Sequence, residues 1–335
     1  MLLAFVVSVF LFRLIHGKFE VVAYTEHADN GPASASVVIS SEEGSVGIKF
    51  LRYGDSLLGA QFIGEEYHNE IPFTAFALMA GAICRVRSFF EAPRSIMQLG
   101  LGIGSVPQSA SECGYTIVNA VENSTTVASF AQDYFGYNAG AVFVQDVLTF
   151  IEGSATCSSQ DTKYHVVAQD LYMGWNPINT LNLDVFSKIK ENLLYSDGVY
   201  VLNFVGYHIG DNSLFSQNVV ATLRSLFTSV KCFRDAPLKY RVDYASNIIC
   251  ISSDKPEILA FGLPDDSLGE VPLDTITTKW INDSFQHWEV FRTLSEQAEV
   301  IELDFDVAPF ESVFRKVVAD MRDFIRPLLD DELWK

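Results

Sequence analysis

The chain has 335 residues, of which 49% are hydrophobic and 13% aromatic, enough to bury a sizeable core and to exclude a disordered chain. Its formal net charge of -19 repels phosphate backbones, which argues against nucleic acid as a partner and suits a small cation. Many proteins are acidic only because they are soluble, so the charge alone identifies no ligand.

The N-terminus begins with an unbroken apolar run at residues 2–12. The run is shorter than the roughly 20 residues of a membrane span, and no basic segment precedes it as in a secretory signal. Three interpretations stay open: a marginal membrane anchor, the end of a longer hydrophobic region, or a first buried strand. Of these three interpretations, we rank the marginal membrane anchor first. We therefore expect a cytoplasmic protein whose residues 1–16 associate with a membrane.

The cysteines are odd in number and widely spaced, and they form no CxxC or Cys/His cluster of the kind that binds zinc. They are Cys84, Cys113, Cys157, Cys232 and Cys250. The pattern predicts no metal site and reduced thiols in a reducing compartment.

The first part of the chain, residues 17–90, is expected to form a small β-sheet module with a linking helix. Short β-rich segments at 19–24, 35–40 and 46–51 alternate with turn residues, a pattern typical of a small antiparallel sheet. Apolar residues then recur without turn residues over 71–85, which predicts the helix.

After Pro93 the pattern changes to apolar strands separated by helical stretches. The expected strands lie at 96–99, 116–121, 142–144, 165–168 and 198–204, with a final antiparallel pair at 229–233 and 247–252. Repeated strand-helix-strand order predicts a parallel sheet with right-handed crossovers. The fold class is therefore α/β, with a Rossmann-like nucleoside-binding domain at 91–255. An acidic extension at 256–335 follows, and its terminal helix, at 309–329, is expected to serve packing or an interaction.

Three glycines follow the first of these strands in the sequence LGLGIGS. Gly100, Gly102 and Gly104 would let the backbone approach a nucleoside and its charged tail, because a side chain would occupy the ligand's space. A glycine-rich turn alone can also be only a tight turn.

Three acids follow the next strands. Glu122 lies about 20 residues after the glycine turn, where a carboxylate can accept hydrogen bonds from ribose hydroxyls. Asp146 can accept from an adenine amino group or cap a helix. Asp170 precedes a loop rich in Gly, Trp and Pro, and it can orient an amine nucleophile and accept its proton.

The order of these features resembles the spermidine and spermine synthases, the polyamine aminopropyltransferases. The residues that carry the resemblance are LRYGDSLLG at 51–59, Tyr67 and Glu70, the glycine turn, and the strand-end acids. The match is greatest with a fungal, membrane-linked branch that carries hydrophobic segments ahead of the enzyme domain.

This resemblance implies an S-adenosylmethionine-dependent transferase domain behind a small N-terminal antiparallel sheet. Decarboxylated S-adenosylmethionine would donate an aminopropyl group to a cationic amine in polyamine biosynthesis, without a metal. The glycine turn would surround the sulfonium end, Glu122 and Asp146 would hold the ribose and adenine, and Gln61 would add a cofactor contact. Asp170 and Tyr67 would be the catalytic residues. Whether the protein forms a homodimer stays open.

Two other functions stay open because the position at which family enzymes carry an acid in the glycine turn is Ile103. One is a methyltransferase that uses intact S-adenosylmethionine, whose carboxylate the turn's amides can hold. The other is a binding protein that kept the fold and lost turnover.

Overall fold

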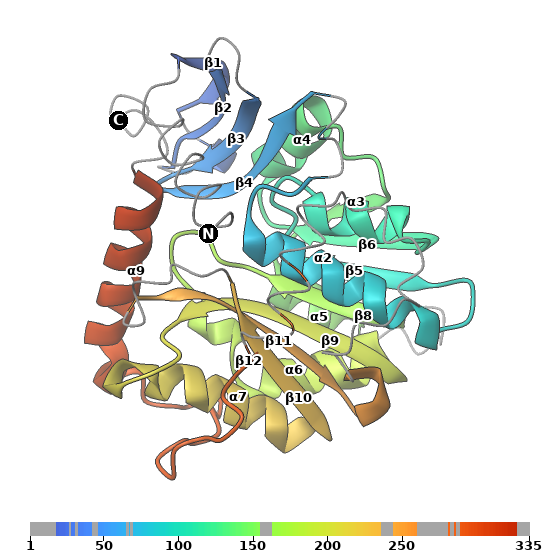
Figure 1. Cartoon of the computed structure of the whole chain (residues 1–335), viewed down its shortest axis with the longest axis vertical. Coiled ribbons are helices and arrows are strands. Elements are labelled where there is room, and N and C mark those ends of the chain that lie inside the picture. The colour runs from blue at the N-terminus through green and yellow to red at the C-terminus, as the bar shows by residue number, and fades with distance from the viewer. Residues whose placement is uncertain are drawn as a thin grey trace.

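The computed structural model of the protein describes residues 18–26, 28–30, 33–41, 46–64, 67, 70–154, 163–235, 244–259, 281, 285 and 289–326. These residues form two sheets, and helix α9 (Glu311–Ile325) runs beside both of them (Figure 1). Within these ranges, no helix is both long and apolar enough to cross a bilayer. The apolar run at 2–12 lies outside the described residues, so its membrane association stays a prediction.

The smaller sheet has four antiparallel strands in chain order: β1 (Lys18–Thr25), β2 (Ala35–Ser41), β3 (Gly47–Tyr53) and β4 (Ser56–Ile63). The β-rich pattern predicted the first three strands but not β4, which begins within the motif at 51–59. The β3–β4 turn is fixed by Arg52, which is buried and donates to the Gly54 carbonyl and to the hydroxyls of Ser34 and Ser36. A buried guanidinium needs such partners to offset its loss of water.

The larger sheet has the order β12-β10-β11-β9-β8-β5-β6-β7. Its strands are β5 (Ser95–Leu99), β6 (Ile117–Glu122), β7 (Ala141–Val144), β8 (Tyr164–Asp170), β9 (Leu194–Gly206), β10 (Ser229–Arg234), β11 (Ser246–Ser253) and β12 (Glu289–Val290). Strands β5 to β9 are parallel, and β11 lies antiparallel between β9 and β10. The predicted α/β fold with a small N-terminal antiparallel sheet and a terminal antiparallel pair is confirmed.

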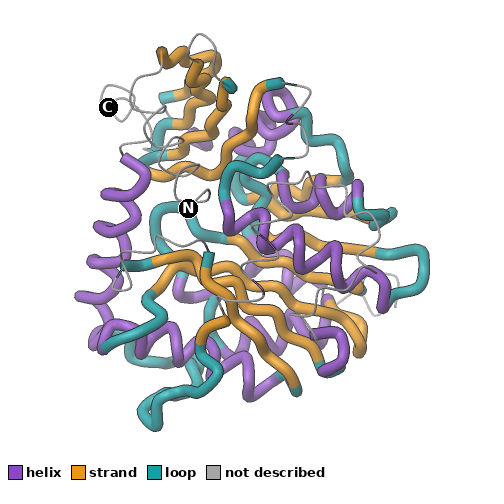
Figure 2. The backbone as a smooth tube through the Cα atoms, viewed as in Figure 1, coloured by secondary structure: helices purple, strands orange, loops and turns teal. Residues whose placement is uncertain are grey.

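Helices cover both faces of the larger sheet (Figure 2). They are α2 (Thr74–Val86), α3 (Ser105–Glu112), α4 (Thr125–Phe135), α5 (Val147–Ser154), α6 (Leu183–Lys188) and α7 (Leu214–Leu226), joined by short 3-10 and π turns. Helices α2 and α3 pack on one face, and α5, α6 and α7 pack on the other.

Alternation along each strand divides the core into these two layers. Ile96 and Val166 point toward α2, whereas their neighbours Met97 and Val167 point toward α6 and α7. All four side chains are fully buried. Strands that are buried on both faces have continuous apolar sequences, which is why the sequence pattern predicted them.

Four of the five cysteines are paired. Cys84 of α2 is bonded to Cys113 just after α3, and Cys232 of β10 is bonded to Cys250, its direct partner on β11. The expectation of reduced thiols is therefore wrong for these four residues, because pairs far apart in the sequence become neighbours through helix packing and strand register. Since disulfides persist in oxidising environments, the pairs also remove the reason for expecting a reducing compartment.

The two disulfides predict a specific pattern of thiol reactivity. Alkylation of the denatured, unreduced protein should leave Cys84, Cys113, Cys232 and Cys250 unlabelled, and all four should label after reduction. Loops of 29 and 18 residues correspond to about 3 kcal/mol of stabilisation each by the chain-entropy estimate, so reduction should lower the urea midpoint. Mass spectrometry showing any of the four labelled before reduction would contradict the pairing.

Candidate active site

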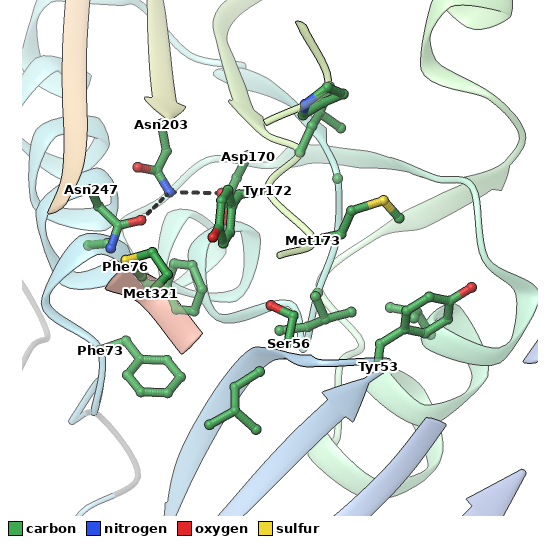
Figure 3. A pocket seen from close by; sticks show the side chains of 18 of the residues that line it. Tyr53, Ser56, Phe73, Phe76, Asp170, Tyr172, Met173, Asn203, Asn247 and Met321 are labelled. Carbon is green, nitrogen blue, oxygen red and sulfur yellow. Dashed lines mark hydrogen bonds between the residues drawn. The ribbon is translucent and has the colours of Figure 1, made fainter. Parts of the chain in front are cut away.

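A cavity of about 380 Å³ lies between the two sheets, at the carboxyl ends of the parallel strands (Figure 3). Its lining comes from the β3–β4 turn, the start of α2, the ends of the central strands, and α9. In open parallel sheets this is the edge at which ligands bind. The lining residues used below are Tyr53, Ser56, Phe73, Phe76, Gly100, Gly102, Glu122, Asp146, Asp170, Tyr172, Asn203, Arg234, Asp235, Asn247, Met321 and Ile325.

The glycine turn is held against two other backbones. Gly100 has a φ of +85°, and a Cβ built there would lie 2.0 Å from the Asp170 carbonyl oxygen. Gly102 has a φ of +56°, and its Cβ would lie 2.7 Å from the Leu58 carbonyl oxygen. Both the left-handed conformation and the space exclude a side chain. Glycine at these positions thus brings the turn onto β8 and β4 at once.

Glu122, at the end of β6, is fixed by backbone donors. Its two carboxylate oxygens accept from the amides of Leu101 and Ser124, each at 3.0 Å. Burial raises the pKa of this carboxyl, while these amide donors oppose the shift. The amides of Gly102 and Asn123 also interact with this carboxylate, so four backbone donors hold it at the cavity wall.

Asp146 both caps a helix and lines the cavity. Its Oδ1 accepts from the Thr149 amide at 2.9 Å and from the Thr149 hydroxyl at 3.2 Å, which closes the first turn of α5. The cap that the sequence analysis left open is therefore present, and it fixes the direction of the carboxylate at the cavity wall.

Asp170 ends β8 and begins a row of four hydrogen-bonded side chains on adjacent strands. The Asn203 amide nitrogen donates to Asp170 Oδ1 at 2.9 Å and to Asn247 Oδ1 at 3.3 Å. The Asn247 amide nitrogen donates in turn to Asp235 Oδ2 at 2.7 Å. The row thus joins two carboxylates through two asparagines, across β8, β9, β11 and the end of β10.

Burial raises the pKa of both carboxyls at the ends of this row to about 6. Hydrogen bonds from Asn203 to Asp170 and from Asn247 to Asp235 oppose the shift, and the charge of Glu122 adds to it at Asp170. Perturbed carboxyls in a cavity are typical of acid-base or cation-binding sites. At neutral pH both groups are ionised, but a cation would stabilise them further.

The sequence pattern pointed to Asp170 but not to the other three members of the row or to the α9 residues. Asn203 stands among apolar side chains in the buried part of β9, residues 198–206, and its Oδ1 has no hydrogen-bond partner among the described residues. A polar side chain within such a run is a signal that could have been used. Asp235 and Asn247 gave no comparable signal, because only the antiparallel strand order links them through Asn203 to Asp170.

Strand order divides the cavity into two halves. We call the part formed by Gly100, Gly102, Glu122 and Asp146 on β5, β6 and β7 the glycine-turn half. The part formed by Asn203, Asn247 and Asp235 on β9, β11 and β10 is the asparagine half. Asp170, on β8, lies between them.

The loop after Asp170 is tied down at its far end. The Asn176 side chain donates to the Val205 carbonyl at 2.7 Å and accepts from the Val205 amide at 2.9 Å, as a paired strand residue would. The Tyr172 hydroxyl donates to the Gly174 carbonyl at 3.0 Å. The loop therefore holds Tyr172 at the cavity, while Trp175 remains exposed.

Three of the predicted catalytic or cofactor-binding residues, Gly104, Gln61 and Tyr67, do not line this cavity. Gly104 begins α3, where its Cα faces the Tyr137 ring. Gln61 is paired with Lys49 across β3 and β4, and the Tyr67 ring lies 5.9 Å from Phe62. A ligand role for these three stays a prediction.

Ile103 is a packing residue. It is 6% exposed and packs with Val37, Leu51 and Val127, and a Cβ built on Gly59 would lie 2.6 Å from it. The apolar side chain joins the glycine turn to the small sheet and to α4. An acid at this position would be buried without a partner, so its absence is explained by packing.

The charge of the described cavity wall is strongly negative. Four of its side chains are carboxylates, namely Glu122, Asp146, Asp170 and Asp235, and one, Arg234, is a cation. Arg234 is engaged with His208, whose Nε2 lies 3.2 Å from a guanidinium nitrogen. No group of three or more metal-binding side chains occurs within the described ranges. The charge of the wall suits a cation.

The fold is similar to a crystal structure of a probable spermidine synthase from Corynebacterium glutamicum, with a TM-score of 0.56 and 16% identity over 66% of this chain and 77% of that chain. Lower TM-scores of 0.44 are found for human methyltransferase-like protein 13 in complex with SAH and for spermidine synthase from Thermotoga maritima. The identities are 19% and 10%, and the matches cover 66% and 72% of this chain and 95% and 80% of those chains. No family model and no curated protein sequence matches. The predicted α/β fold with a small N-terminal antiparallel sheet is thus shared with the Corynebacterium glutamicum structure; the activity is a separate question.

The effect of the close contact between Gly100 and β8 on stability can be tested by replacing Gly100, with a second glycine of positive φ as the control. Gly100→Ala should cost the strain of a left-handed alanine plus the clash with the Asp170 carbonyl, together about 3 kcal/mol of unfolding free energy. Gly114 has a φ of +93° but open space around it, so Gly114→Ala should cost only about 1 kcal/mol. Urea denaturation giving equal losses for the two variants would show that the contact does not constrain the turn.

The raised pKa of Asp170 predicts a stability cost that depends on pH. Because the folded pKa is raised, the stabilising contribution of the protonated group is complete below pH 3.8 and is lost as pH rises through about 6. A pKa of about 6 against 3.8 corresponds to about 3 kcal/mol, so Asp170→Asn should be more stable than the wild type by up to that amount at pH 8.

Urea denaturation at pH 8 and pH 5 measures this effect. The advantage of Asp170→Asn should shrink markedly at pH 5, whereas Asp304→Asn, which removes an exposed charge, should show little advantage at either pH. An Asp170→Asn variant no more stable than the wild type at pH 8 would contradict the raised pKa.

Proposed function

We propose that the protein transfers an aminopropyl group from decarboxylated S-adenosylmethionine to an amine acceptor. The observation that carries this proposal is Asp170, a carboxylate between two halves of one acid-lined cavity. The glycine-turn half has the residues for a nucleoside, and the asparagine half has space and acceptors for an amine. The resemblance to the aminopropyltransferases rests in part on the residues of the glycine-turn half and on Asp170.

The charge of the cavity favours the decarboxylated cosubstrate. Intact S-adenosylmethionine carries a carboxylate as well as its sulfonium and ammonium, whereas the decarboxylated form has only the two cations. Four wall carboxylates attract the second form more strongly and repel the carboxylate of the first. Ile103 supplies no charge, so in this chain the selectivity would come from the wall as a whole.

Asp170 would position the acceptor and take its proton. The neutral amine nitrogen attacks the carbon next to the sulfonium; the new C–N bond forms as the C–S bond breaks, and the bonding electrons leave with sulfur. The products are the alkylated amine and methylthioadenosine, and the amine proton passes to Asp170 and then to water. A pKa of about 6 leaves the carboxylate ionised at neutral pH yet closer to the amine's than an exposed aspartate would be.

One observation favours a methyltransferase as the second candidate. Ile103 is buried in packing, so the glycine turn offers no side-chain carboxylate for an aminopropyl ammonium. A turn without that acid does not repel the carboxylate of intact S-adenosylmethionine, although the amides of Gly100, Leu101 and Gly104 already donate to Val121, Glu122 and Leu101. The two functions differ in which form of the cosubstrate binds more tightly.

Calorimetry with S-adenosylmethionine, its decarboxylated form and methylthioadenosine, followed by an assay for amine alkylation, tests the proposal. The decarboxylated form should bind most tightly, and Glu122→Ala should weaken all three ligands. Asp170→Asn should bind methylthioadenosine about as well as the wild type but lose at least about a hundredfold in transfer rate. Preference for the intact form would favour the methyltransferase, and no binding of any ligand would contradict both.

A further inference from the structure

Helix α9 forms a wall of the cavity although it comes from the C-terminal extension. Met321 and Ile325 line the cavity, and Ile325 also packs on the core of the small sheet with Phe50 and Phe73. Met321 packs with Tyr172, Val205 and Tyr207, beside the asparagine half. The helix thus closes the cavity between the two sheets.

Met321 is held between two anchored neighbours. The Asp320 carboxylate accepts from the Tyr207 hydroxyl at 2.5 Å, the Ala245 amide at 3.3 Å and the Lys316 ammonium at 3.2 Å, and it is 8% exposed. On the other side, Arg322 is paired with Asp55 of the β3–β4 turn at 3.0 Å. The exposed Arg322–Asp55 ion pair contributes little to stability, whereas the buried hydrogen-bond network of Asp320 holds α9 in place. The wall is therefore a fixed boundary.

The position of Met321 relative to the hydrogen-bonded row shows which half of the cavity α9 bounds. In Figure 3 the Met321 side chain lies with Phe76 and Phe73 on the side of Asn203 and Asn247, away from Tyr53 and Met173. An amine held near Asp170 would extend its carbon chain along this apolar side. The methionine side chain is long and flexible, so it can fill the end of such a space.

We infer that Met321 is a specificity-determining residue that limits the length of the amine acceptor in the asparagine half. The inference rests on the proposed function and adds to it the element and the side chain that select the acceptor. It gives the C-terminal helix a role at the site, beyond the packing or interaction surface expected from the sequence.

The test uses the full chain and a series of linear α,ω-diaminoalkanes of increasing length. Met321→Ala should raise kcat/KM for long diamines relative to short ones by about tenfold, because several side-chain atoms are removed from the wall. Met321→Trp should lower the same ratio by a similar factor. Val317→Ala is the matched control, since Val317 lies one turn earlier in the same buried cluster but does not line the cavity. Its ratio should equal that of the wild type.

Calorimetric binding of the same diamines in the presence of methylthioadenosine separates this inference from the proposed function. A shift of the binding preference toward longer diamines in Met321→Ala, without transfer by any variant, would support the inference and overturn the function. Transfer with the same length preference in wild type, Met321→Ala and Met321→Trp would overturn the inference alone. An equal shift in Val317→Ala would also overturn it, and no diamine binding by the wild type would overturn both.

Discussion

The site depends on the contact of one glycine turn with two backbones that come from different sheets. Gly100 lies against the carbonyl of Asp170, and Gly102 lies against the carbonyl of Leu58. Because neither position has room for a side chain, the ends of β5 and β8 and the start of β4 approach as closely as backbones can. The depth of the cavity and the position of Asp170 follow from this approach, and Ile103 completes it with apolar packing.

The sequence predicted those parts of the fold and site that depend on local pattern. Apolar runs marked the parallel strands, and Glu122, Asp146 and Asp170 were found because each directly follows such a run and therefore lies at one edge of the sheet. The asparagine half depends instead on β11 entering between β9 and β10, and the pairing of Cys232 with Cys250 depends on the same register. Strand order and register are set by tertiary packing, which a single sequence does not display.

The site contains groups that lower the stability of the folded protein but are useful for binding or catalysis. Asp170 and Asp235 are ionised at neutral pH although burial favours their neutral forms, and Asn203 leaves a buried oxygen without a partner among the described residues. Folded proteins retain such groups where binding or catalysis needs them. The surrounding core, with its fully buried strands on both sides of the sheet, supplies the stability that offsets them.

Helix α9 also sets the order in which the cavity is completed as the chain is made. Among the described residues, the other wall elements, from the β3–β4 turn to β11, precede α9 in the sequence. During synthesis the earlier parts of a chain leave the ribosome first and begin to fold first. The apolar side chains that α9 later covers, such as Tyr172 and Phe73, therefore face water or a chaperone until the helix arrives. The cavity is therefore complete only after the last of its described wall elements has been made and has packed.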